Sequence, residues 1–183
     1  INIITRSGTN AVHGTGFWDY YNQDMGARLD YNETAVPFKR KRTGGAAGGP
    51  FVKDQLFWFG NWERTYQTGQ EIYRSPEFPQ LNVSQAFPIG IRYSKARLDW
   101  NASPMVRVFY SFQHDWNEAT GGSAPSPFQN VNWTNTNTAA LDISQTRMTH
   151  SIRFGYVNFN NRIQSQELSV KFPRVDGTPY FLD

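Results

Sequence analysis

The sequence of 183 residues lacks cysteine, carries a net charge of only +3 and contains no long hydrophobic run. No stretch approaches the ~18 apolar residues of a membrane-spanning helix, and a mean hydropathy of −0.62 excludes a helical membrane protein. The small and scattered net charge argues against nucleic acid as a partner. The absence of cysteine excludes disulfides but does not by itself assign a compartment.

Strand-like segments rich in aromatic residues, which make up 16% of the chain, are joined alternately by short and long connections. We predict strands at 13–23, 43–49, 55–66, 91–100, 105–116, 136–143 and 148–160. The short connections are 50–54, 101–104 and 144–147, and the long ones are 24–42, 67–90 and 117–135. Transmembrane β-barrels sort their connections this way, because their periplasmic turns are short and their extracellular loops are longer. The pattern predicts an all-β antiparallel meander, part of a transmembrane β-barrel in the bacterial outer membrane.

Several of these segments alternate apolar and polar residues, as strands with two different faces do. In 105–113, alternate residues from Val106 to Phe112 are apolar, and Phe109 breaks the pattern on the other face. The segments 95–101, 139–144 and 151–158 alternate in the same way, and the charges on their polar faces look unpaired, which suits a wet lumen. A half-buried sheet of a soluble protein would also alternate. Aromatic residues near the strand ends favour the girdles of an outer-membrane barrel; they are Trp18, Tyr20, Trp58, Trp62, Trp100, Trp116 and Tyr156.

The chain opens with an apolar strand-like run and no initiator methionine, so we expect a fragment of a longer protein. Seven strands are too few for a plugged transporter, which has about 22. An open sheet edge facing lipid is not viable. The sequence therefore leaves two possibilities, a truncated barrel or a small soluble sheet.

Five stretches resemble TonB-dependent outer-membrane receptors, in particular their Oar-like (OmpA-related) subgroup with a carboxypeptidase-regulatory-like domain. Residues 1–10 (INIITRSGTN) resemble the end of the plug domain, and residues 13–17 (HGTGF) resemble the opening of the first barrel strand. Residues 43–59 (TGGAAGGPFVKDQLFWF) resemble the first hairpin of that barrel, while ARLDW at 96–100 and RFGY at 153–156 resemble later strands.

The resemblance implies that residues 1–9 end a plug domain and that residues 10–183 begin a barrel of about 22 strands. It also implies energised uptake of a large or scarce ligand such as a siderophore, an oligosaccharide or a peptide. The implied partners are outer-membrane lipid and lipopolysaccharide, and the TonB–ExbB–ExbD complex through the plug region.

No catalytic or metal-binding constellation is evident, so we expect neither enzymatic activity nor a cofactor. Ser111, His114 and Asp115 are triad residue types, but they crowd one strand end without an oxyanion-loop signature. The histidines lack metal-ligand spacing. A β-rich glycoside hydrolase would need Glu63 and a second carboxylate about 5–10 Å apart. The other alternative is a soluble carbohydrate-binding β-sandwich, which would explain the aromatic residues and the Asn/Thr-rich loops.

Two groups of residues are candidates for binding. The run Lys39, Arg40, Lys41 and Arg42 is a predicted basic patch at the outer rim, able to contact lipopolysaccharide phosphates or to attract anions. A solvated loop or strand end would show the same run. Trp116, Phe128 and Trp133 lie in predicted external loops, where they could stack on sugar or peptide ligands. Girdle anchoring or loop packing explains them equally well.

Overall fold

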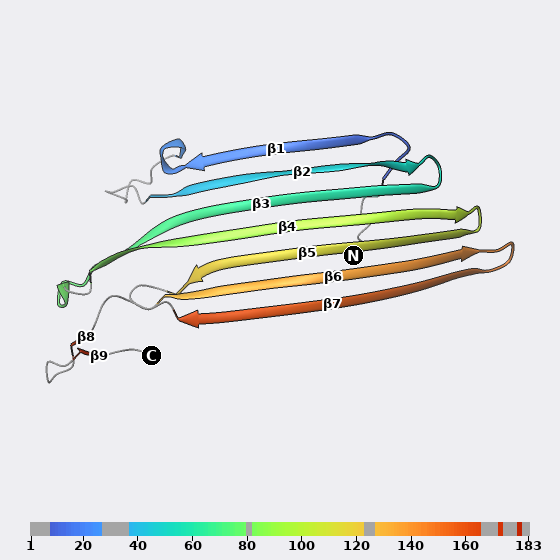
Figure 1. Ribbon diagram of the computed structural model, residues 1–183. Helices are drawn as coiled ribbons and strands as arrows, with labels where there is room; N and C mark the ends of the chain where they lie inside the picture. The colour runs from blue at the N-terminus through green and yellow to red at the C-terminus, as the bar shows by residue number, and fades with distance from the viewer. Residues whose placement is uncertain are drawn as a thin grey trace.

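The computed structural model describes residues 8–26, 37–79, 82–122, 127–165, 172–173 and 179–180. Seven strands form one antiparallel sheet in which each strand pairs with the next along the chain (Figure 1). Their bounds are β1 His13–Asn22, β2 Lys39–Val52, β3 Leu56–Tyr73, β4 Val83–Ser103, β5 Val106–Gly121, β6 Phe128–Ser144 and β7 Thr149–Ser165. The predicted all-β meander is confirmed.

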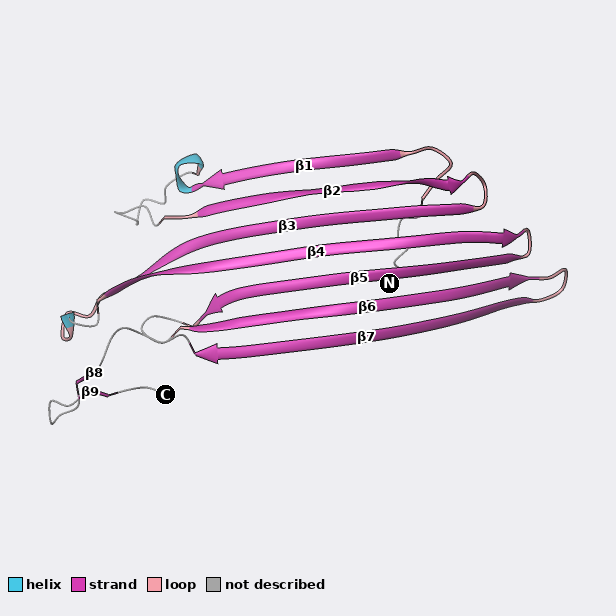
Figure 2. Cartoon of the chain, in the orientation of Figure 1, coloured by secondary structure: helices cyan, strands magenta, loops and turns pink. Residues whose placement is uncertain are grey.

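Little else accompanies the sheet (Figure 2). A 3-10 turn, η1 (Gln23–Met25), follows β1, and the short strands β8 (Phe172–Pro173) and β9 (Pro179–Tyr180) pair with each other. No helix in the described residues is long and apolar enough to cross a membrane.

The three short turns all lie at one end of the sheet, and the longer connections lie at the other (Figure 1). The turn between β2 and β3 contains Asp54 in the left-handed region, with φ of 62°. Aspartate tolerates this conformation better than most residues because its short side chain can bond locally. The predicted sorting of short and long connections is therefore confirmed.

The strands are longer than predicted at the end with the long connections. β3 continues to Tyr73 and β4 begins at Val83, within the connection predicted at 67–90. β5 and β6 likewise extend into the connection predicted at 117–135. The prediction failed there because the backbone ladder continues where the side chains are Asn, Thr and Gln. Pairing requires backbone donors and acceptors, not apolar alternation.

The strand register gives the sheet one apolar face and one polar face, because directly paired residues in a ladder point to the same side. Leu56 pairs with Trp100, which pairs with Val108. Val108 pairs with Leu141, and Leu141 with Ile152. The alternations predicted strand by strand therefore combine into one continuous apolar face. The opposite face, which carries Arg97 and Asp99, is called the polar face below.

The sheet has almost no core of its own. Phe59 and Ala140 are the buried hydrophobic residues among those described, whereas Trp100 is 50% exposed and Phe154 is 63% exposed. A β-sandwich would cover such rings with a second packed sheet. The described part of the chain has no such layer, which contradicts the soluble β-sandwich alternative.

Candidate functional site

A cluster of paired charges lies on the polar face near the short turns. Arg97 and Asp99 stand two residues apart on β4 and so point to the same side. The guanidinium of Arg97 donates two hydrogen bonds to the carboxylate of Asp99, at 2.8 and 2.6 Å. On β6 and β7, Arg153 pairs with Asp142 at 2.7 Å, and the hydroxyl of Ser151 donates to the same carboxylate. Four of the charges on these faces are therefore paired, although the sequence suggested unpaired charges; they are Arg97, Asp99, Asp142 and Arg153.

The contacts of Phe109 explain why this apolar residue lies on the polar face of β5. Its ring lies on the polar face beneath Arg97, whose guanidinium carbon is 4.3 Å from the ring centroid, and near Arg153, at 5.9 Å. A cation over an aromatic face is attracted by the ring quadrupole. Phe109 thus supports both ion pairs, and the side chains of Arg97 and Asp99 are only 13% and 18% exposed.

The segment that precedes β1 lies against this same region. Gly8 helps to line a cavity of about 340 Å³ together with residues of the charged cluster. A side chain at Gly8 would not fit, because a Cβ atom there would lie 2.5 Å from the carbonyl oxygen of Trp58 and 2.8 Å from the Cβ atom of Phe57. The chain therefore approaches β1 across the polar face, in close contact with the sheet.

Asn10 fastens this segment to the first short turn. Its side-chain oxygen accepts a hydrogen bond from the backbone N–H of Asp54 at 2.8 Å, and its side-chain nitrogen donates to the Asp54 carboxylate. Asn101 holds the same turn from the other side, since its side chain donates to the Asp54 carbonyl at 3.1 Å. Three segments far apart in the sequence meet at this turn. Sequence reasoning missed the contact, because no local pattern links Asn10 to Asp54.

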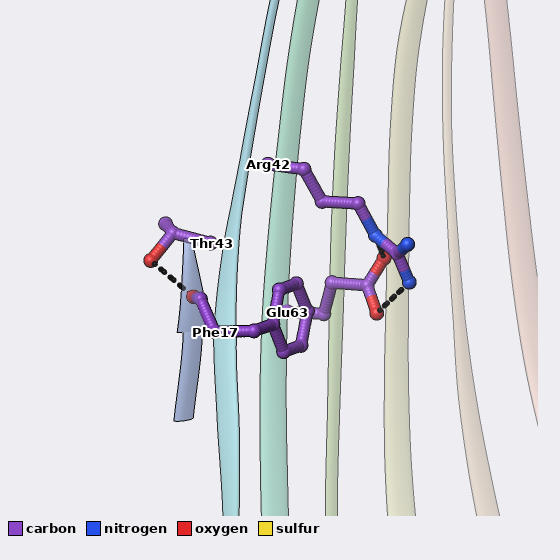
Figure 3. Close-up of polar contacts among 4 residues, drawn as sticks. All are labelled: Phe17, Arg42, Thr43 and Glu63. Carbon is purple, nitrogen blue, oxygen red and sulfur yellow. Dashed lines mark hydrogen bonds and ion pairs between the residues drawn. The ribbon is translucent and has the colours of Figure 1, made fainter. Parts of the chain in front are cut away.

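A third ion pair lies on the polar face further from the short turns. The Arg42 guanidinium donates to both carboxylate oxygens of Glu63, at 2.7 and 3.0 Å, and lies 4.9 Å from the ring centroid of Phe17 (Figure 3). Thr43 points away from this pair, and its hydroxyl donates to the backbone carbonyl of Phe17. Gly44 makes room for the arrangement, because a Cβ atom there would lie 2.9 Å from the Phe17 ring.

The predicted basic patch is divided between the two faces. Lys39, Arg40, Lys41 and Arg42 are part of β2 and do not form a loop. Because strand residues alternate, Lys39 and Lys41 lie on the apolar face, whereas Arg40 and Arg42 lie on the polar face. The four basic side chains therefore do not share one face, and their binding of lipopolysaccharide phosphates or other anions stays a prediction.

The three candidate ligand-binding aromatic residues lie on strands, not in external loops. Trp116 on β5 and Trp133 on β6 are direct cross-strand partners on the apolar face. Phe128 begins β6, on the polar face, opposite Gly121. The placement of the two tryptophans favours the anchoring role considered above. Ligand binding by these residues stays a prediction.

The candidate triad residues do not share a face of β5. Ser111 and Asp115 point to the polar face and His114 points to the apolar face, where its Nδ1 atom is 2.6 Å from the side-chain oxygen of Asn135. These three groups therefore cannot act together. The described residues also contain no group of three or more acidic, histidine or cysteine side chains able to hold a metal ion.

A single-layered meander with one apolar and one polar face, and with short turns at one end only, defines the wall of a transmembrane β-barrel. In such a wall the apolar face contacts lipid and the polar face lines the lumen. Residues 4–88 match the family model of an outer membrane beta barrel domain. No curated protein and no solved structure matches the chain. The chain is thus part of an outer-membrane β-barrel protein, and the predicted location in the bacterial outer membrane is confirmed.

Proposed function

We propose that the chain forms the plug–barrel junction and first strands of a TonB-dependent receptor of the Oar-like subgroup. In this proposal residues 1–9 end the plug, and residues 10–183 begin the barrel wall. The receptor would take up a ligand of the siderophore, oligosaccharide or peptide class. Energy would come from the TonB–ExbB–ExbD complex acting on the plug region.

The observation that supports the proposal most is the path of residues 8–12. Gly8 lies against the polar face, so the described chain reaches β1 from the side that lines the lumen. A plug that fills a barrel and leads into its first strand requires this path. The hydrogen bonds between Asn10 and Asp54 would then fix the end of the plug to the periplasmic rim, so that a pull on the plug moves residues before Asn10 and leaves β1 in place.

The polar face is suited to a polar ligand of either charge. It combines paired arginines and carboxylates with uncharged groups in the middle of β5, where Gln113 donates to Asp115 and accepts from the hydroxyl of Tyr93. Because charges of both signs occur on this face and three ion pairs join some of them, the wall offers hydrogen bonds without a strong field of one sign. Of the three predicted ligand-contacting aromatic residues, Phe128 is the one placed on this face, at its outer end.

Uptake assays on the natural host test the proposal. We would delete the gene and measure uptake of an iron–ferrichrome complex, a labelled maltoheptaose and a labelled tryptic peptide mixture, each with and without a protonophore. We expect uptake of one probe to be lost on deletion and to be abolished by the protonophore in the wild type. Deletion-sensitive uptake that ignores the protonophore would indicate a passive channel. Unchanged uptake of all three probes would contradict the assigned ligand classes.

A further inference from the structure

The apolar face carries an unexpected excess of positive charge away from the short turns. In the seven strands, five Lys or Arg residues lie on this face but only one acidic residue, Glu118. These basic residues are Lys39, Lys41, Arg64, Arg92 and Arg162. Lys39, Lys41 and Arg162 lie near the strand ends that lead to the long connections, and Arg64 and Arg92 lie at the middle of β3 and β4. The long connections face the cell exterior in barrels of this class. The polar face, in contrast, carries both signs.

Arg64 on β3 and Arg92 on β4 are direct cross-strand partners on this face. Like charges in this position repel each other and destabilise a sheet. Neither residue takes part in an ion pair within the described part of the chain. The Arg92 guanidinium lies 4.5 Å from the ring centroid of Trp116, which holds it close to the sheet. The strand pairing therefore brings two cations together, and no ion pair within the described residues compensates their charge.

The height of the pair in the membrane can be estimated from the register. Leu56 and Trp100 form the cross-strand pair of β3 and β4 that lies nearest the short turns. Arg64 lies eight residues beyond Leu56 on β3, and Arg92 lies eight residues before Trp100 on β4. At about 3.4 Å per residue and a tilt of about 40°, this places both arginines roughly 21 Å above that row, near the outer edge of an apolar band ~25 Å tall. Head groups of the outer leaflet begin at this level.

Two hollows flank Arg64. One, of about 200 Å³, lies between Arg64 and Arg92 and is also lined by Trp116 and Glu118. The other, of about 390 Å³, is lined by Arg64, Lys41 and aromatic rings that include Tyr66. Glu118 is the one carboxylate in these hollows, and it accepts a hydrogen bond from the side chain of Gln129. Cations therefore predominate around Arg64.

We propose that Arg64 and Arg92, assisted by Lys41, bind a phosphate group of a phosphorylated lipid head group in the outer leaflet. Guanidinium groups bind phosphate through paired charge-assisted hydrogen bonds. A phosphate between the two arginines would remove their repulsion, and the neighbouring rings would contact the head group. The two arginines lie on β3 and β4, and Lys41 is the one residue that this site shares with the basic run at 39–42. The proposal does not depend on the proposed transport function.

Lipid binding to the full-length protein in non-ionic detergent tests the proposal. The probes are bisphosphorylated lipid A, the same lipid without phosphate, and inorganic phosphate, with affinities measured by native mass spectrometry. The test variant is Arg64→Gln/Arg92→Gln. The matched control is Arg40→Gln, which removes an arginine of the same rim from the polar face. Heat-modifiable electrophoretic mobility verifies that each variant is a folded barrel.

We expect the double variant to bind bisphosphorylated lipid A at least about tenfold more weakly, the effect of losing charge-assisted hydrogen bonds. The control should bind it within about twofold of the wild type, and the lipid without phosphate should not distinguish the variants. Equal losses in the double variant and the control would overturn the proposal, since the rim would then attract anions without a defined site. Unchanged affinity in the folded double variant, or inorganic phosphate binding as tightly as the lipid, would also overturn it.

Discussion

Replacing Asn10 by alanine removes both side-chain hydrogen bonds that join the segment before β1 to the turn at Asp54. Both bonds are exposed to solvent, so each contributes about 0.5–1.5 kcal/mol. A combined loss of about 1–3 kcal/mol corresponds to a rise of roughly 5–150-fold in the ratio of released to bound segment. We therefore expect residues 8–12 to leave the wall far more often in Asn10→Ala.

A nitroxide spin label at Ala11→Cys measures this release in the full-length protein. The 183 residues contain no cysteine, so the introduced cysteine is the single labelling site within them. The electron paramagnetic resonance spectrum separates a mobile from an immobile label, and the mobile fraction should increase in Asn10→Ala. Asn10→Asp should increase it further, because a second carboxylate would then face Asp54 and repel it.

Asn22→Ala is the matched control for this experiment. Asn22 lies at the other end of β1, where its side chain accepts a hydrogen bond from the backbone of Asp24 in η1. Its replacement should leave the label at Ala11→Cys immobile. The argument fails if the mobile fraction in Asn10→Ala equals that of the wild type, or if Asn22→Ala raises it equally.

Three further predictions concern stability, measured as urea unfolding of the full-length protein in detergent. Gly44→Ala should lower the free energy of unfolding by about 1–3 kcal/mol through overpacking, because the new Cβ atom would lie 2.6 Å from a carbonyl oxygen of β3. Gly16→Ala is the control and should not lower it, because the nearest atom to its Cβ atom would be 3.8 Å away. Phe109→Ala should cost about 1 kcal/mol for each guanidinium above the ring in addition to lost packing, and a cost no greater than that of Phe109→Leu would contradict this. Asn135→Leu leaves His114 without its partner on the apolar face and should cost about 1–3 kcal/mol. Adding His114→Leu should recover most of that loss, and additive costs would show that the two side chains do not interact.

Much of the strand architecture follows from local sequence. The side of the sheet to which a residue points depends only on alternation along its own strand, so the faces of 95–101, 105–113, 139–144 and 151–158 were predicted correctly. Turn residues are equally local, and the short connections predicted at 50–54, 101–104 and 144–147 overlap the observed turns at 53–55, 104–105 and 145–148. The outer ends of the strands were not predicted, because no apolar face marks them beyond the membrane.

The sites depended on which residues the register brings together. The pairing of Arg64 with Arg92 joins positions 28 residues apart, and that of Asn10 with Asp54 joins positions 44 residues apart. Alternation along a strand divides the basic run between two faces, but this can be predicted only if the run is known to be part of a strand. The structure shows that β2 begins at Lys39. Sequence alone therefore determined the class of fold and the two faces of the four strands that alternate clearly. The tertiary structure decided which charges meet, because pairing across a sheet is set by hydrogen bonds between distant segments.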